Sequence, residues 1–120
     1  MFVSDLIRSA DASIILIDNY LDDTVLKLLA KRKPDVAITL FTRKITPRLS
    51  LEADKFNRQY GGLEIRQLTN CHDRFLLVDD TSLYHIGASL KDLGKNWFAF
   101  SKIDTLLPSL LARLKESKSR

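Results

Sequence analysis

Apolar and polar positions in the first half of the chain alternate between two kinds of pattern. Short runs of apolar or alternating residues predict strands at 14–17, 36–41 and 63–68. Between them, residues 22–33 and 50–60 carry apolar positions at helical spacing, and each stretch begins near a residue that can cap a helix. Because helices alternate with strands, we expect a largely parallel sheet with helices packed on its faces.

The second half of the chain has a different pattern. Three short apolar runs at residues 75–78, 83–86 and 97–100 predict further strands, and the tight turn at Asp80-Thr81 predicts a hairpin between the first two. Leucines from 106 to 114 then form the apolar stripe of a last helix. The predicted fold is an α/β/α sandwich with a mixed, mostly parallel sheet.

Composition fits one compact domain over residues 1–120, with 45% hydrophobic and 28% charged residues. No apolar run is long enough to span a bilayer and no leader pattern opens the chain, so we expect neither membrane insertion nor export. The single cysteine favours a reducing compartment, and hence the cytoplasm. A net charge of +4 favours an anionic partner. The apolar helical pattern starts without a polar lead-in, which suggests a domain excised from a longer protein.

The segment "HDRFLLVDD" carries the most specific candidate chemistry. Residues two apart on a strand point the same way, so His72 and Arg74 are expected side by side on one face. An imidazole can act as a nucleophile or a base, and a guanidinium fork suits phosphate oxygens. Asp79 or Asp80, if folded back, could orient the imidazole ring.

This segment resembles the His-x-Lys-x4-Asp motif of the phospholipase D superfamily, with His72, Arg74 and Asp79 at the same spacing. The family's glycine-serine-x-asparagine segment is matched by Gly87 and Ser89, while Lys91 stands near the place of the asparagine. The order of predicted elements is similar to the sandwich of this family over nearly the whole chain. The resemblance also extends to the C-terminal domains of longer bacterial and phage-related chains that carry a DNA-binding module upstream.

The resemblance implies a phosphodiesterase or nuclease that works through a phosphohistidine intermediate, without metal or cofactor. His72 would be the nucleophile or, in the second subunit, the general acid, and Arg74 would hold the phosphate. Asp79 and Ser89 would be supporting polar groups, with Lys91 as a replacement donor. Because the chain has one copy of the motif, a complete site implies a homodimer that brings two His72 side chains together.

Two departures from the motif leave a second reading open. Arginine replaces lysine with a different donor geometry, and the asparagine is missing, which weakens the case for catalysis more than the case for phosphate binding. The alternative is a catalytically degraded domain that serves as a nucleic-acid-binding or dimerisation module.

A basic loop after the second predicted strand supports a nucleic-acid partner. Arg43, Lys44 and Arg48 follow a strand end, where open α/β sheets collect ligands, although a solvated basic loop is the commoner explanation. Nucleic acid is favoured over lipid because the chain is basic and lacks an amphipathic membrane-binding surface.

Other chemically capable residues have structural explanations that compete with functional ones. Asp18, Asn19 and Tyr20 follow the first strand and could line the cleft or simply shape a turn. His85 is more typical of a hydrogen-bonded structural histidine. Cys71 lacks partners at metal-ligand spacing. The aromatic residues at 97–100 could stack on bases, but aromatics in a strand are usually core.

Overall fold

The computed structural model describes residues 3–19, 21, 23–69, 74–86, 100–102, 108, 110–112 and 114. Within these residues the elements follow one another in the order α1 (Val3–Ser9), β1 (Ser13–Ile17), α2 (Asp23–Leu29), β2 (Ala37–Thr42), α3 (Pro47–Gln59), β3 (Leu63–Gln67), β4 (Arg74–Val78), β5 (Ser82–Ile86) and β6 (Phe100–Lys102). The described residues between 108 and 114 are also helical.

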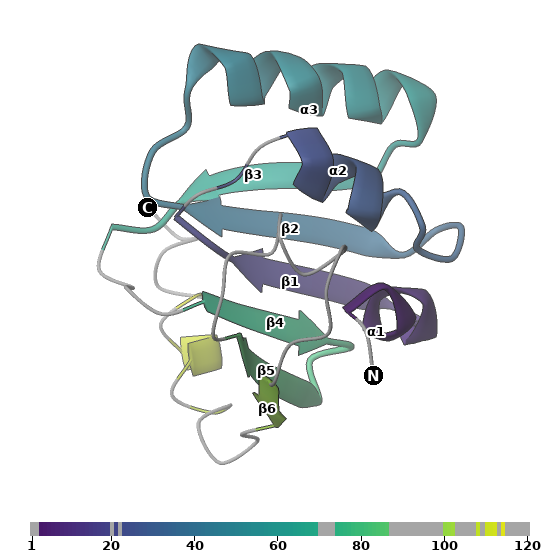
Figure 1. Ribbon diagram of the computed structural model, residues 1–120, viewed down its shortest axis with the longest axis vertical. Helices are drawn as coiled ribbons and strands as arrows, with labels where there is room; N and C mark the ends of the chain where they lie inside the picture. Colours follow the sequence, from purple (N-terminus) through teal and green to yellow (C-terminus); the bar gives the residue numbers. More distant parts are fainter. Residues whose placement is uncertain are drawn as a thin grey trace.

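The strands form one mixed sheet in the order β3-β2-β1-β4-β5-β6 (Figure 1). β1 pairs with β2, and β2 with β3, in parallel, while the three pairings from β1·β4 to β5·β6 are antiparallel. A mixed α/β fold is therefore confirmed. The prediction of a mostly parallel sheet is wrong, because two of the pairings are parallel and three are antiparallel. The β4–β5 turn is too short for a parallel crossover, so these two strands can pair only as a hairpin.

Two apolar cores lie on the two faces of the sheet. Strand residues alternate between the cores, with Ile14 and Leu16 of β1 in one and Ile15 and Ile17 in the other. The first core also holds the apolar sides of α1, α2 and α3. The second core is covered by Leu110 and Leu114 of the last helical segment. Helices thus contribute to both faces, as expected of a sandwich.

Two helix boundaries differ from the prediction: α2 ends at Leu29 and not at residue 33, and α3 begins before residue 50. Ser50 was the predicted cap, but the helix begins three residues earlier, at Pro47, and Thr46 is its N-cap. The Thr46 hydroxyl accepts a hydrogen bond from the backbone N–H of Leu49 at 3.1 Å. Pro47 is favourable at this position because the first helical N–H has no partner within the helix. The Thr-Pro pair therefore starts the helix directly after the basic loop.

Candidate phosphate-binding edge of the sheet

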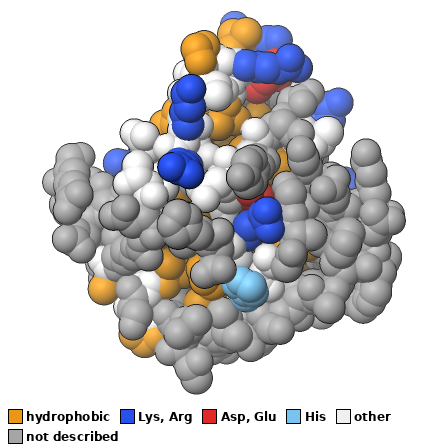
Figure 2. Space-filling model, turned by 60° about the vertical axis from the view of Figure 1, so that its left-hand side comes forward, with side chains coloured by type: hydrophobic (Ala, Val, Ile, Leu, Met, Phe, Trp, Pro, Cys, Tyr) orange, Lys and Arg blue, Asp and Glu red, His pale blue; other side chains and the backbone are white. Residues whose placement is uncertain are grey.

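The parallel strands β1, β2 and β3 end at one edge of the sheet, which we call the carboxyl edge. Asp18 and Asn19 follow β1, Arg43 and Lys44 follow β2, and β4 begins at the same edge with Arg74 because it runs antiparallel to β1. Figure 2 turns this edge toward the viewer and shows Lys and Arg side chains on its upper part. The edge collects polar side chains from three strands above apolar cores, as ligand sites of open α/β sheets do.

Asp18 and Arg74 form the most buried charged contact of the edge. Ile17 is paired with Phe75, so Asp18 and Arg74 face each other one step further along the two strands. The Asp18 Oδ1 lies 3.6 Å from the Arg74 Nε, and Asp18 is fully buried while 28% of the Arg74 side chain is exposed. The Asp18 backbone N–H also donates to the Phe41 carbonyl at 3.0 Å, which fixes the end of β1. Part of the Arg74 charge is thus already neutralised by the protein.

Asp79 lies at the opposite end of β4. Asp79 lies five residue steps of extended chain from Arg74, a distance of about 16 Å. Its carboxylate accepts hydrogen bonds from the backbone N–H groups of Asp11, Ala12 and Ser13, at 2.7 to 3.1 Å. These bonds hold the pKa of Asp79 below its usual range, and Ala12 contributes most. The structure therefore does not bring Asp79 together with Arg74, and its carboxylate does not fold back toward the carboxyl edge.

The basic loop between β2 and α3 is anchored at both ends. The Gln67 side-chain amide donates to the Arg43 carbonyl at 2.9 Å, and Thr46 caps α3. Arg43, Lys44 and Arg48 are all exposed. Within the part of the chain that the structure describes, none of these three side chains forms an ion pair. Arg43 and Lys44 of the loop and Arg48 in the first turn of α3 thus carry charges that no described residue pairs with, on an anchored backbone.

Four candidate site residues lie outside the described residues, namely Tyr20, His72, Ser89 and Lys91, and so does Cys71, for which no role was predicted. Their roles stay predictions. His85 lies opposite Phe75 on β5, and the two rings meet edge to face with centroids 5.4 Å apart. Because His85 is paired with Phe75, the two side chains point to the same face of the sheet. Arg74 is the neighbour of Phe75 on β4 and therefore points to the opposite face. This placement favours the structural reading of His85.

Two features are absent from the described residues. Among them, no group of three histidine, cysteine or acidic side chains is arranged to hold a metal ion. In the same part of the chain, no helix has the length and apolar character needed to cross a membrane.

The sequence matches no known protein family and no curated protein. The fold does match solved structures, and one of them is TrmBL2, an archaeal chromatin protein whose structure is described as showing a novel mode of DNA binding. The two share 16% identity with a TM-score of 0.59, over 95% of this chain and 43% of that chain. This chain thus spans less than half the length of TrmBL2, and a likeness at this identity shows the fold alone.

Proposed function

We propose that the protein binds nucleic-acid phosphates at the carboxyl edge of its sheet. The observation that carries this proposal is the anchored basic loop with Arg43 and Lys44, followed by Arg48 in the first turn of α3; all three are exposed and make no ion pair with other described residues. Cations on a fixed loop lose less conformational freedom on binding a phosphate backbone than cations on a mobile tail. The net charge of +4 and a fold shared with a DNA-binding chromatin protein add support.

A matched pair of triple variants tests this proposal. Arg43, Lys44 and Arg48 are changed to Gln in the first variant, and Arg8, Lys31 and Arg58 in the second, all of them exposed. Both variants lose three positive charges, so any difference between them reports position and not net charge. Affinity for a labelled DNA duplex is measured by fluorescence anisotropy at several salt concentrations.

We expect the first variant to bind roughly tenfold more weakly, with a salt slope smaller by about two to three, because each lost phosphate contact removes about 0.9 from the slope. The second variant should keep most of the affinity. Equal losses in both variants would show that net charge alone attracts DNA and would refute a site at the carboxyl edge.

Phosphodiester hydrolysis of the phospholipase D type is the second candidate function. The observation that favours it is the position of Arg74, whose partly exposed guanidinium starts β4 at the carboxyl edge. In this proposal His72 of one subunit attacks phosphorus and the P–O bond to the leaving group breaks, the partner subunit's His72 protonates that leaving oxygen, and water then hydrolyses the phosphohistidine. Arg74 stabilises the phosphate oxygens, and Ser89 and Lys91 supply further donors. It ranks second because the Asp18 carboxylate weakens the field of Arg74 at a bound phosphate.

Hydrolysis of bis(p-nitrophenyl) phosphate in the presence of EDTA tests the second candidate. Activity should persist in the chelator and disappear in His72→Ala, while circular dichroism and DNA binding stay unchanged. Because the proposed mechanism needs two His72 side chains, the active species should sediment as a homodimer. Hydrolysis that survives His72→Ala, or that stops on chelation, contradicts this mechanism.

A further inference from the structure

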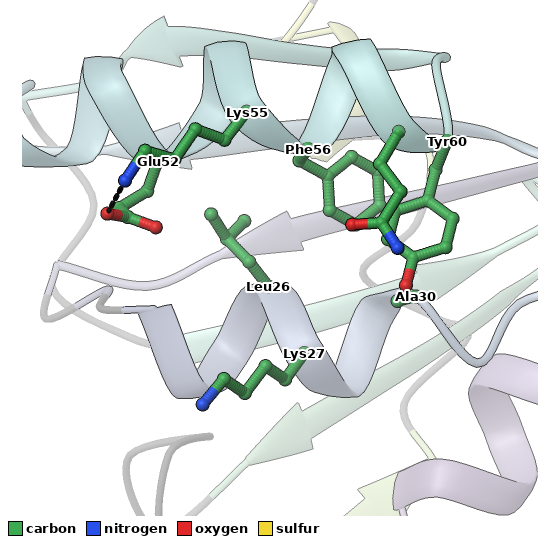
Figure 3. A pocket seen from close by; sticks show the side chains of 8 residues that line it. Leu26, Lys27, Ala30, Glu52, Lys55, Phe56 and Tyr60 are labelled. Carbon is green, nitrogen blue, oxygen red and sulfur yellow. Dashed lines mark hydrogen bonds and ion pairs between the residues drawn. The ribbon is translucent and has the colours of Figure 1, made fainter.

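A groove of about 460 Å³ lies between α2 and α3 (Figure 3). Its volume falls in the range of about 300–1,000 Å³ that is usual for small-molecule sites. Leu26 and Phe56, both buried, and the half-buried Ala30 form its apolar floor. Tyr60 closes one end and points from the end of α3 toward Ala30. The groove therefore offers a ligand an apolar base and an aromatic wall.

The aromatic wall is held in place and is partly exposed. The Phe56 and Tyr60 rings lie 5.0 Å apart, and the Arg32 guanidinium sits 5.4 Å from the centre of the Phe56 ring. Arg32 is itself fixed, because it donates to the carbonyls of Val36 and Gly61 at 2.6 Å. Tyr60 keeps 49% of its surface exposed. The exposed Tyr60 ring, packed against the Phe56 ring that Arg32 holds, suits a flat ligand that stacks on it.

The charged groups at the mouth of the groove give it a positive balance. Lys27 on α2 forms no ion pair with any described residue, and Lys55 on α3 has only a long contact, 3.5 Å, to Glu52. An anionic group at the mouth could compete with Glu52 for Lys55 and also approach Lys27, which lines the groove from α2. The apolar floor, the aromatic wall and the two cations together match a ligand that combines a flat aromatic ring with an anionic group.

We propose that the groove between α2 and α3 binds a planar aromatic anion, with the ring on the floor beside Tyr60 and the anionic group between Lys27 and Lys55. A nucleoside monophosphate and an aromatic carboxylate share this chemistry. The site goes beyond the proposed nucleic-acid binding and uses none of the carboxyl-edge residues. The triple change of Arg43, Lys44 and Arg48 should therefore leave it intact.

The probe for this site is 8-anilinonaphthalene-1-sulfonate, an aromatic anion that fluoresces in apolar surroundings. We expect saturable binding of one molecule per chain. Lys27→Gln and Lys55→Gln should weaken it roughly two- to fivefold each, the usual range for exposed charge contacts. Glu52→Gln should strengthen it by a similar factor because Lys55 is released. Lys31→Gln removes an exposed charge outside the groove and serves as the control.

A blocking variant and two competitors complete the test. Ala30→Leu fills the floor without changing any charge and should abolish binding, while circular dichroism and thermal unfolding verify the fold of every variant. Displacement of the probe by adenosine monophosphate would identify a nucleotide site, and displacement by 1-naphthoate alone would identify an aromatic carboxylate or sulfonate site. A fluorescence increase that does not saturate would overturn the proposal. So would a probe affinity that is the same in the wild type and in the Lys27, Lys55 and Glu52 variants.

Discussion

The carboxylate of Asp79 accepts a hydrogen bond from the backbone N–H of Ala12 at 2.7 Å. Through this bond, and through the bonds from Asp11 and Ser13, the β4–β5 turn is tied to the start of β1. Asp79 has a positive φ of 56°, a conformation that Asp and Asn tolerate better than most residues. Asp79 thus has an observed structural role at the end of the sheet away from Arg74.

Asp79→Asn is expected to destabilise the protein by about 1 kcal/mol, since it weakens hydrogen bonds to a charged acceptor much as the loss of a helix cap does. Asp79→Ala should cost more, because alanine is also strained at this φ. The neighbouring Asp80→Asn, at the same φ in an exposed position, is the matched control and should change little. Urea unfolding measures all three variants.

The effect of Asp79 should depend on pH. Its folded-state pKa is lowered, so its contribution to stability is present at neutral pH and is lost as the pH falls below about 4. The stability difference between the wild type and Asp79→Asn should therefore shrink between pH 5 and pH 2. A difference that stays constant over this range would argue against the charge of Asp79 as its source.

The buried pair of Asp18 and Arg74 should be strongly coupled. Arg74→Gln leaves the Asp18 carboxylate buried without its arginine, which should cost about 2 kcal/mol, less than the roughly 3–5 kcal/mol of fully buried pairs because Arg74 is partly exposed. The double variant Asp18→Asn with Arg74→Gln should be more stable than Arg74→Gln alone. A double-mutant cycle in urea measures the coupling, and additive effects would show that the contact is energetically unimportant.

The same pair should control how strongly the carboxyl edge attracts phosphate. Asp18→Asn leaves the charge of Arg74 without its acidic partner, so DNA affinity is expected to rise roughly two- to fivefold. Asp54→Asn removes an equal charge from an exposed position on α3 and controls for net charge. If both changes raise the affinity equally, Arg74 does not contact the DNA.

Local sequence patterns were sufficient to place most strands, because continuous or alternating apolar runs such as residues 14–17 depend only on nearby residues. The order of the strands depends on long-range pairing. The sequence could not show that β1 lies between β2 and β4, and this position alone sets Asp18 opposite Arg74. The start of α3 is ambiguous in the sequence for a different reason. Ser50 and Thr46 are both residue types that cap helices, and only Thr46, followed by Pro47, is the N-cap in the structure.

The candidate site was predicted only in part. The prediction that the basic loop follows a parallel strand is confirmed. A strand followed by cations is a local feature of the sequence. The α2–α3 groove could not be foreseen, since Leu26 and Tyr60 come together only through the packing of two helices. The same holds for Asp79, whose hydrogen bonds join residues 66 to 68 positions apart in the chain.

The two glycines after α3 allow a test of backbone geometry. Gly61 and Gly62 both have a φ of 77°, where a side chain is strained, so Gly61→Ala should cost about 1 kcal/mol. A Cβ on Gly61 would meet nothing within 4 Å, whereas one on Gly62 would lie 3.2 Å from the Arg32 guanidinium. Gly62→Ala should therefore be the more destabilising change. In an Arg32→Ala background the two substitutions should cost the same, as urea unfolding can establish.

Asn57 protects the outer edge of the sheet. β3 is the terminal strand of the described sheet, and the Asn57 side chain both donates to the Leu63 carbonyl and accepts from the Leu63 N–H, each at 2.9 Å. Asn57→Ala should cost about 1–2 kcal/mol and expose these backbone groups to strands of other molecules.

Light scattering at increasing protein concentration should then detect self-association of Asn57→Ala that the wild type lacks. Asn57→Asp is the matched variant, because it keeps the acceptor for the Leu63 N–H but loses the donor to the carbonyl. It should lie between the wild type and Asn57→Ala in stability, and its added negative charge at the edge should oppose association. If Asn57→Ala lowers the stability without any association, Asn57 anchors α3 to β3 but does not guard the edge.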